Sequence, residues 1–246
     1  MLTRLLVLLL ASLLAACANH DPNRYIAPVN PSQLLQIPSG KGAVIIGHSV
    51  KNPTERSLQL APDSTGIGWI AIDPVTGRRV GVDAAVAQLT CNMLGNCDAD
   101  TGRAVQYQVY VLDPGTYALG WVANGGTVAE PSIFSSLTTA PGFSVSLDAR
   151  AQATTPVFKL APGEVVYPGD LIFDFASNDR LSWTIVQNDA AARRYLSATG
   201  LAGQLIDRPI RRADGAPVRA TDGAVIVGHL PGTITFGSMS GGGAYR

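Results

Sequence analysis

Two near-identical hexamers, close to opposite ends of the chain, each place a histidine directly after a glycine. AVIIGH ends at His48 and AVIVGH ends at His229. Imidazole is a common metal ligand, so two such strands lying side by side would bring His48 and His229 together, and a neighbouring carboxylate would complete a zinc-like site. The alternative is that both hexamers are core strands of similar composition, because no third ligand is visible and the flanks SVKNP and LPGTI differ. We favour core strands, with no metal and no cofactor.

Patterns that would indicate an enzyme are missing or incomplete. GSMSG has no serine at the centre of a G-x-S-x-G motif, GKGAVIIG lacks the spacing of a phosphate-binding loop, and no His-Glu-x-x-His occurs. Asp170 and Asp174 share one strand face, where carboxylates are usually solvent-facing. Trp69, Trp121 and Trp183 each lie in an expected strand, which favours core anchors over a carbohydrate-binding platform. We therefore predict a protein that is not an enzyme.

The first residues indicate export and anchoring. Arg4 precedes an apolar run that is shorter than the ~20 residues of a membrane-spanning helix, and the run ends in Leu-Ala-Ala-Cys at Cys17. This segment resembles the lipobox of bacterial lipoproteins, in which the cysteine is lipidated and becomes the first residue of the mature protein. Acyl chains hold a protein on a bilayer without a spanning helix. In the same resemblance, Ala18 is not the aspartate that retains lipoproteins in the inner membrane, which implies the periplasmic face of the outer membrane.

The remaining two cysteines, Cys91 and Cys97, bracket the residues NMLGN. The periplasm is oxidising and lipidation would consume Cys17, so we expect a disulfide between them; a redox pair would need Cys-x-x-Cys. The oxygen-rich segment 96–102 partly matches a calcium loop. An EF-hand, however, needs Gly and Glu where this chain has Thr101 and Tyr107, so an Asx-rich turn is favoured.

Charge excludes one class of partner. Without Arg4 the chain has 17 basic and 18 acidic residues and a formal charge of −1, so nothing in it attracts nucleic acid.

We expect a signal peptide at 1–16, the lipidated cysteine and a flexible tether at 17–38, a β domain at 39–237 and a flexible tail at 238–246. The tether prediction rests on Asn, Pro and Ser without apolar periodicity.

Pro-Gly pairs punctuate the chain and predict its fold class. They stand at 114/115, 141/142, 162/163, 168/169 and 231/232. Proline and glycine suit the central positions of β-turns, so we predict hairpins within 105–122 and 157–175. Further strands are expected at 43–47, 68–72, 143–147, 181–186, 224–228 and 233–236. Many short strands predict a β-sandwich of immunoglobulin or transthyretin type, with one short helix near 189–199 that starts at Asn188 or Asp189 and ends at Gly200.

The segment FKLAPGEVVYPGDL, followed by Asn188, Asp189 and a short helix, resembles a group of bacterial envelope lipoproteins with no established activity. Their β-sandwich domain carries a PGE-x-x-Y-x-GD segment, and the likeness covers about residues 105–200. We therefore expect a non-enzymatic binding or structural module of the cell envelope, acting through a protein partner. The alternative is a small-ligand or metal-binding envelope sensor that uses His48 and His229.

Overall fold

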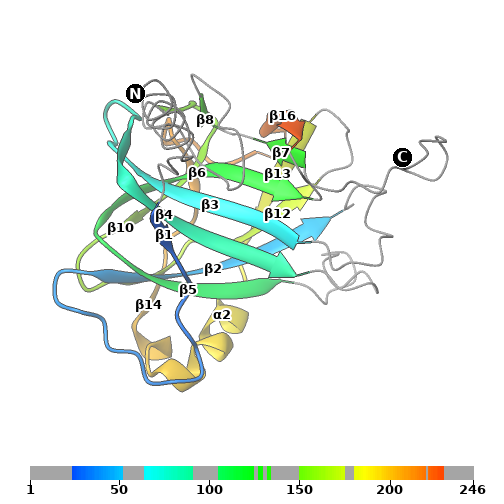
Figure 1. Ribbon diagram of the computed structural model, residues 1–246. Coiled ribbons are helices and arrows are strands. Elements are labelled where there is room, and N and C mark those ends of the chain that lie inside the picture. Colours follow the sequence, from blue (N-terminus) through cyan, green and yellow to red (C-terminus); the bar gives the residue numbers. More distant parts are fainter. Residues whose placement is uncertain are drawn as a thin grey trace, which may run out of the picture.

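The computed structural model describes residues 24–51, 64–90, 105–124, 127–129, 132–133, 150–174, 180–219 and 221–229. Within them the fold is mainly β, with a short helix, as predicted (Figure 1). The helical elements are α2 (Asp189–Tyr195) and the 3-10 turns η3 (Ser197–Thr199) and η4 (Ala202–Gln204). The strands are β1 (Arg24–Ile26), β2 (Gly42–Lys51), β3 (Ser64–Ile72), β4 (Arg79–Thr90), β5 (Gln106–Leu112), β6 (Gly115–Asn124), β7 (Thr127–Ala129), β8 (Ser132–Ile133), β9 (Arg150–Ala151), β10 (Pro156–Leu160), β11 (Val165–Tyr167), β12 (Asp170–Asp174), β13 (Arg180–Val186), β14 (Leu205–Asp207), β15 (Arg211–Arg212) and β16 (Gly223–His229).

Fourteen of the described strands form one continuous sheet in the order β1-β4-β3-β6-β7-β16-β13-β12-β2-β11-β14, with β10 beside β6, β15 beside β10, and β5 beside β2. β8 and β9 form a small separate sheet. The long sheet folds over, so that the half containing β3, β4, β6 and β10 faces the half containing β2, β5, β12 and β13 (Figure 1). An immunoglobulin sandwich is antiparallel, whereas here β1–β4, β2–β11, β2–β12 and β11–β14 pair in parallel.

Large apolar side chains from both halves fill the space between them. Trp69, Trp183, Phe158 and Phe173 belong to this central core, and Trp121 packs in a second cluster on the outer face of β3 and β6. All three tryptophans are at most 2% exposed, which confirms that they are core anchors. Burial of such large rings removes a large apolar area from water, and this stabilises the fold.

Helix α2 and its following turns cover the other face of β2 and β5 (Figure 1). Because successive residues of a strand point to opposite faces, Val44 and Ile46 enter the central core while Ala43 and Ile45 pack beneath the helix. β2 is thus apolar on both faces, as expected for a covered strand. The prediction that AVIIGH is a core strand is confirmed. AVIVGH forms β16, as predicted, but its side chains lie outside the described residues.

The Pro-Gly pairs at 114/115 and 162/163 turn the chain, but the predicted hairpins are wrong; the pairs at 141/142 and 231/232 lie outside the described residues. β5 pairs with β2 while β6 pairs with β3, β7 and β10, so the turn at Pro114-Gly115 links the two halves of the sandwich. Likewise β10 pairs with β6 and β15, whereas β11 pairs with β2 and β14. Gly163 has a φ of 74°, as glycine allows after Pro162, and the Glu164 amide donates to the Ala161 carbonyl. The turn chemistry was correct, but the strand partners were not.

The pair Pro168-Gly169 does not reverse the chain at all. β11 and β12 run in the same direction along one edge of β2, and their registers differ by one residue, because Val166 lies opposite Val44 while Asp170 lies opposite Gly47. Pro168-Gly169 is therefore a bulge between two parts of one kinked strand. A Cβ on Gly169 would lie 2.7 Å from the Gln187 side chain, which favours glycine at this position.

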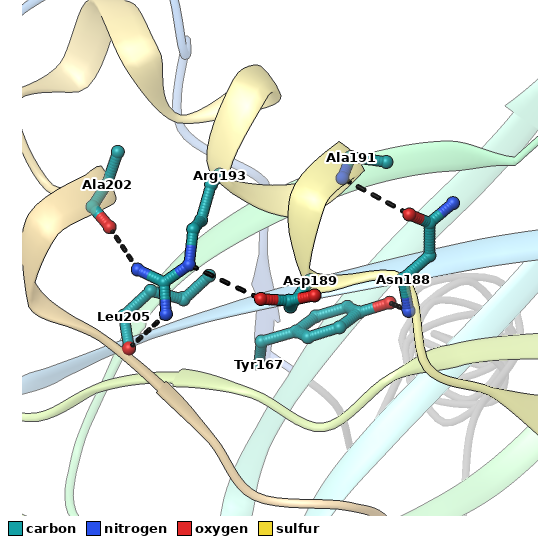
Figure 2. A network of polar contacts seen from close by, with 7 residues as sticks. All are labelled: Tyr167, Asn188, Asp189, Ala191, Arg193, Ala202 and Leu205. Carbon is teal, nitrogen blue, oxygen red and sulfur yellow. Dashed lines mark hydrogen bonds and ion pairs between the residues drawn. The ribbon is translucent and has the colours of Figure 1, made fainter.

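The helix agrees closely with its predicted signals. Asn188 is the N-cap and accepts from the Ala191 amide at 3.3 Å (Figure 2). Gly200 adopts a left-handed conformation at the end of η3. The α-helical part ends at Tyr195, and the 3-10 turn η3 continues to residue 199. Arg193 ties the helix to the following segment by donating to the carbonyls of Ala202 and Leu205 at 2.7 and 3.1 Å.

The predicted tether is too long. β1 pairs with β4, the Val29 amide donates to the Val109 carbonyl at 2.7 Å, and the Leu35 amide donates to the Thr199 carbonyl at 3.0 Å. Val29, Leu35 and Ile37 also pack against the helix-side cluster. Residues 24–38 therefore lie on the folded domain, and their pairing with β4 and β5 was not visible in their own composition.

The strands predicted at 43–47, 68–72, 181–186 and 224–228 are confirmed within β2, β3, β13 and β16. Those predicted at 143–147 and 233–236 lie outside the described residues, as do the signal peptide at 1–16 and the tail at 238–246. β4, the longest of the described strands, was not predicted. In the described part of the chain, no helix has both the length and the hydropathy to cross a membrane.

Candidate functional site

β2 carries a polar group at the carboxyl end of AVIIGH, and that group points into the central core. His48 is fully buried, its Nδ1 lies 2.8 Å from Oε1 of Gln108, and Nδ1 must donate because an amide oxygen only accepts. Nε2 accepts from the indole Nε1 of Trp69 at 3.2 Å. The Phe173 ring stacks nearly parallel to the imidazole, with 6.5 Å between centroids.

These contacts hold the imidazole in its neutral form. Burial lowers the pKa of His48 to about 4, and the hydrogen bond with Gln108 opposes the shift in part. Both ring nitrogens already have partners, and a metal ligand needs a free lone pair. In this arrangement His48 acts as a hydrogen-bonding core residue.

One residue earlier, the opposite face of β2 meets a buried carboxylate. Asp170 is 1% exposed, and its Oδ1 accepts from the Tyr167 hydroxyl at 2.9 Å while Oδ2 accepts from the Tyr107 hydroxyl at 3.1 Å. The Tyr167 oxygen in turn accepts from the amide of Asn188, the N-cap of α2, at 2.9 Å (Figure 2). This chain of hydrogen bonds connects the bulge after β11 to the start of the helix. The expectation that Asp170 faces solvent is wrong.

Gly47 makes room for this carboxylate. A Cβ at position 47 would overlap the Asp170 carboxylate and would lie 2.6 Å from a methyl of Val105. The glycine that precedes the histidine in AVIIGH is thus explained by packing, because only a hydrogen atom fits between β2 and Asp170. Gly47 and His48 lie on opposite faces of the strand and serve two separate polar clusters.

Burial dominates the electrostatics of the Asp170 cluster. It raises the pKa of Asp170 above the ordinary aspartate range, and the hydrogen bonds from Tyr167 and Tyr107 offset this only in part. Burial also raises the pKa of both tyrosine hydroxyls, which stay protonated and donate to the carboxylate. A carboxyl with a raised pKa is what a general acid or base requires. Here, however, its oxygens are occupied by two tyrosines and shielded from solvent.

The other residues of the PGE-x-x-Y-x-GD segment also have structural contacts. Glu164 accepts two hydrogen bonds from the guanidinium of Arg208, at 2.6 and 2.7 Å, which keep the pKa of this carboxyl below its usual range. The same carboxylate accepts from the Ala161 amide and closes the turn around Pro162-Gly163. Every named position of the segment thus shapes the path of the chain from β10 to β12.

His48 and His229 do not meet. β12 and β13 lie between β2 and β16, which places the two strands about 14 Å apart across the sheet. His48 is level with Leu171 and Ile185, and His229 lies beyond the pair Arg180–Val225, further from Ile185 along the sheet. The offset is roughly nine residues, or about 30 Å at ~3.3 Å per residue. The shared metal site that depended on adjacent strands is therefore wrong.

The remaining candidate residues lie elsewhere. Cys17, Cys91, Cys97 and the segment 96–102 are outside the described residues. Among the residues that the structure describes, no group of three or more His, Cys, Asp and Glu side chains is placed to hold a metal ion.

Comparison with known proteins adds no further assignment: no family model, no curated protein and no solved structure matches this chain.

Tyr107, Gln108 and Tyr167 are partners of the candidate residues that the sequence alone did not indicate. Tyr107 and Gln108 are neighbours on β5 and, because side chains alternate, they serve the helix-side and core-side clusters respectively. The one available signal was the Y-x-GD spacing within the quoted segment, which places Tyr167 and Asp170 on either side of a bulge. Burial of that bulge depends on the helix, which follows later in the chain.

Proposed function

We propose that this protein is a lipid-anchored lipoprotein of the bacterial cell envelope that acts as a non-enzymatic binding or structural module, through a protein partner. Its place is the periplasmic face of the outer membrane, and Cys17 carries the anchor. The main support is that His48 and Asp170, the two buried groups best suited to chemistry, are both fully engaged in packing and hydrogen bonds.

The packed segment 24–38 sharpens this proposal. If Cys17 is the lipidated residue, only seven residue steps separate the anchor from Arg24, where β1 begins. At ~3.3 to 3.6 Å per residue, the segment between Cys17 and Arg24 spans roughly 25 Å at most. The sandwich then stays close to the membrane surface, where it can meet the membrane-proximal parts of a partner.

Membrane fractionation of a Cys17→Ser variant tests the anchor. Lipidation requires the thiol, so the variant should leave the membrane fraction as a soluble or uncleaved form. Cys91→Ser is the matched control, because it makes the same substitution at another cysteine and leaves Cys17 intact, and it should fractionate like the wild type. Recovery of the Cys17→Ser variant with the outer membrane at the wild-type level would contradict the proposal.

Crosslinking in intact envelopes tests the partner. The proposal expects one protein to be recovered with the wild type, and recovered less with the unanchored Cys17→Ser variant. Turnover of a substrate by the purified full-length chain, lost in an Asp170→Asn variant that remains folded, would instead make the protein an enzyme.

A further inference from the structure

A cleft of about 270 Å³ lies on the outer face of the sandwich half that contains β3, β6 and β10. Ile72, Thr116 and Val157 form its floor, and the segment 208–215 forms one wall. None of these residues belongs to the His48 or Asp170 cluster. Its volume is roughly nine times that of a water molecule in the liquid, which suits a small ligand or a single side chain.

Strand register explains why two cations project into this cleft. Lys159 lies opposite Thr116, and Val157, two residues earlier on β10, lies opposite Arg211 of β15. Paired and i+2 residues share one face of a sheet, so Lys159 and Arg211 are diagonal neighbours on the cleft side. Both side chains are exposed, while Val157 beneath them is buried.

The other two basic residues of the cleft are already neutralised. Arg208 makes a two-hydrogen-bond pair with Glu164, and Arg212 pairs with Asp214 at 2.7 Å and with Asp222 at 3.6 Å. Among the residues that the structure describes, the Lys159 and Arg211 side chains have no ion-pair or hydrogen-bond partner. Four basic and three acidic side chains thus leave about one positive charge in excess at the cleft.

The wall of the cleft is held in place before any ligand arrives. Amides of Arg208, Ile210 and Ala213 donate to the carbonyls of Tyr167, Pro168 and Thr155, at 3.0, 2.8 and 2.8 Å. A site whose backbone is already ordered loses less conformational entropy when it binds.

We propose that this cleft binds a monocarboxylate with a short apolar body, with Lys159 and Arg211 holding the carboxylate and Ile72 and Val157 contacting the apolar part. A single excess positive charge matches a monoanion better than a phosphate dianion. The guanidinium of Arg211 suits the planar geometry of a carboxylate. This inference deepens the proposed function, and rests on it only in treating the protein as a binding module; it does not require the anchor at Cys17.

Titration of the purified full-length protein with hexanoate, at constant ionic strength and followed by calorimetry, tests the site directly. We expect a dissociation constant of about 1 mM, as suits so small a ligand. Hexanamide lacks the charge, acetate lacks the apolar body and inorganic phosphate carries more charge, so each should bind at least several-fold more weakly. Arg211→Gln or Lys159→Gln should weaken hexanoate binding about tenfold, the loss expected for one charged hydrogen bond.

Arg194→Gln is the matched control, because it removes the same charge from an exposed position on α2, against the opposite half of the sandwich. It should bind hexanoate like the wild type. The proposal is overturned if hexanoate does not bind, if binding is unchanged in both cleft variants, or if phosphate binds more tightly than hexanoate. These outcomes are independent of the fractionation of Cys17→Ser, so failure of the cleft and failure of the anchor are distinguishable.

Discussion

Each face of β2 has a buried ionisable side chain, a base on one face and an acid on the other. On the central-core side, the base His48 is buried between the two halves of the sheet; on the helix side, the acid Asp170 is buried over Gly47. Each group has two hydrogen-bond partners. In both cases burial favours the uncharged form, so one β-strand separates a histidine with a lowered pKa from an aspartate with a raised one.

The difference matters because the two groups change stability in opposite directions as the pH changes. Below pH 6.5 an unfolded histidine binds a proton that folded His48 rejects, so acid destabilises the fold. Above the ordinary aspartate pKa an unfolded aspartate releases a proton that folded Asp170 retains longer, so rising pH destabilises the fold. Between about pH 4 and 6.5 the two contributions oppose each other, and single variants should separate them.

Truncating an isoleucine on either face of β2 should have the largest effect. Ile46→Ala and Ile45→Ala should each lower the free energy of unfolding by about 2 to 5 kcal/mol, through lost burial and a new cavity. We expect the greater loss for Ile46, since the two sheet halves can adjust less than the short helix over Ile45. Urea denaturation measures both, and the partly exposed Ile206→Ala serves as control. Equal, small losses would contradict the two-sided burial of β2.

Lowering the pH should destabilise the wild type through His48. Its pKa shift from 6.5 to about 4 corresponds to about 3 kcal/mol of stability that is present above pH 6.5 and lost as the pH falls toward 4. His48→Gln should be less stable than the wild type at neutral pH but should lack this acid sensitivity. Urea midpoints between pH 4 and pH 8 measure it. An unchanged pH profile in His48→Gln would show that His48 is not buried in neutral form.

Adding one methyl group beneath Asp170 should come next. Gly47→Ala places a carbon against the carboxylate, and overpacking of this kind typically costs about 1 to 3 kcal/mol. Combining it with Asp170→Ala should recover part of the loss, since the overlap with the carboxylate then disappears while the close contact with Val105 remains. Gly203→Ala is the control, because a Cβ there meets no atom within 4 Å. Strictly additive effects of the two changes in a double-mutant cycle would refute the packing role of Gly47.

Asp170→Asn should give the smallest change at a fixed pH and the clearest change in pH dependence. The amide keeps an oxygen acceptor for one tyrosine and cannot ionise. Wild-type stability includes a component that falls as the pH rises above the ordinary aspartate pKa, and this component should vanish in the variant. Thermal unfolding across the same pH range checks it, with the double variant His48→Gln/Asp170→Asn expected to vary least. A steeper fall with rising pH in Asp170→Asn would reverse the assignment.

Local features were predicted well because their causes are local. Asn188 and Gly200 mark the helix through caps made within a few residues, and Pro162-Gly163 forms its turn by backbone geometry alone. Partner choice is not local. The same turn chemistry at Pro114-Gly115 could close a hairpin or link two halves of a sandwich, and only the competition for β2 and β3 decides which.

Other predictions were wrong because the segments that cover each face of a strand lie far away in the sequence. β4 contains an alanine-rich run in which Val86 is the one β-branched residue, yet Ala84, Ala85 and Ala87 are buried and the run pairs with β3. The i, i+4 spacing of Asp170 and Asp174 correctly placed both on one strand but gave no information about the tyrosines above Asp170. The AVI(I/V)GH likeness, in turn, reflected two strands of similar composition and not a common site.

The pairing of β2 also has a consequence for how fast the chain can fold. Its neighbours β5, β11 and β12 begin roughly 65, 120 and 130 residues later in the sequence, and two of them pair in parallel. The loops that must close before these contacts form are long, so the protein has a high contact order and should fold in milliseconds to seconds. The chain must be available as far as Asp174 before β2 is paired along both edges, and a shorter chain would leave an edge of AVIIGH unpaired.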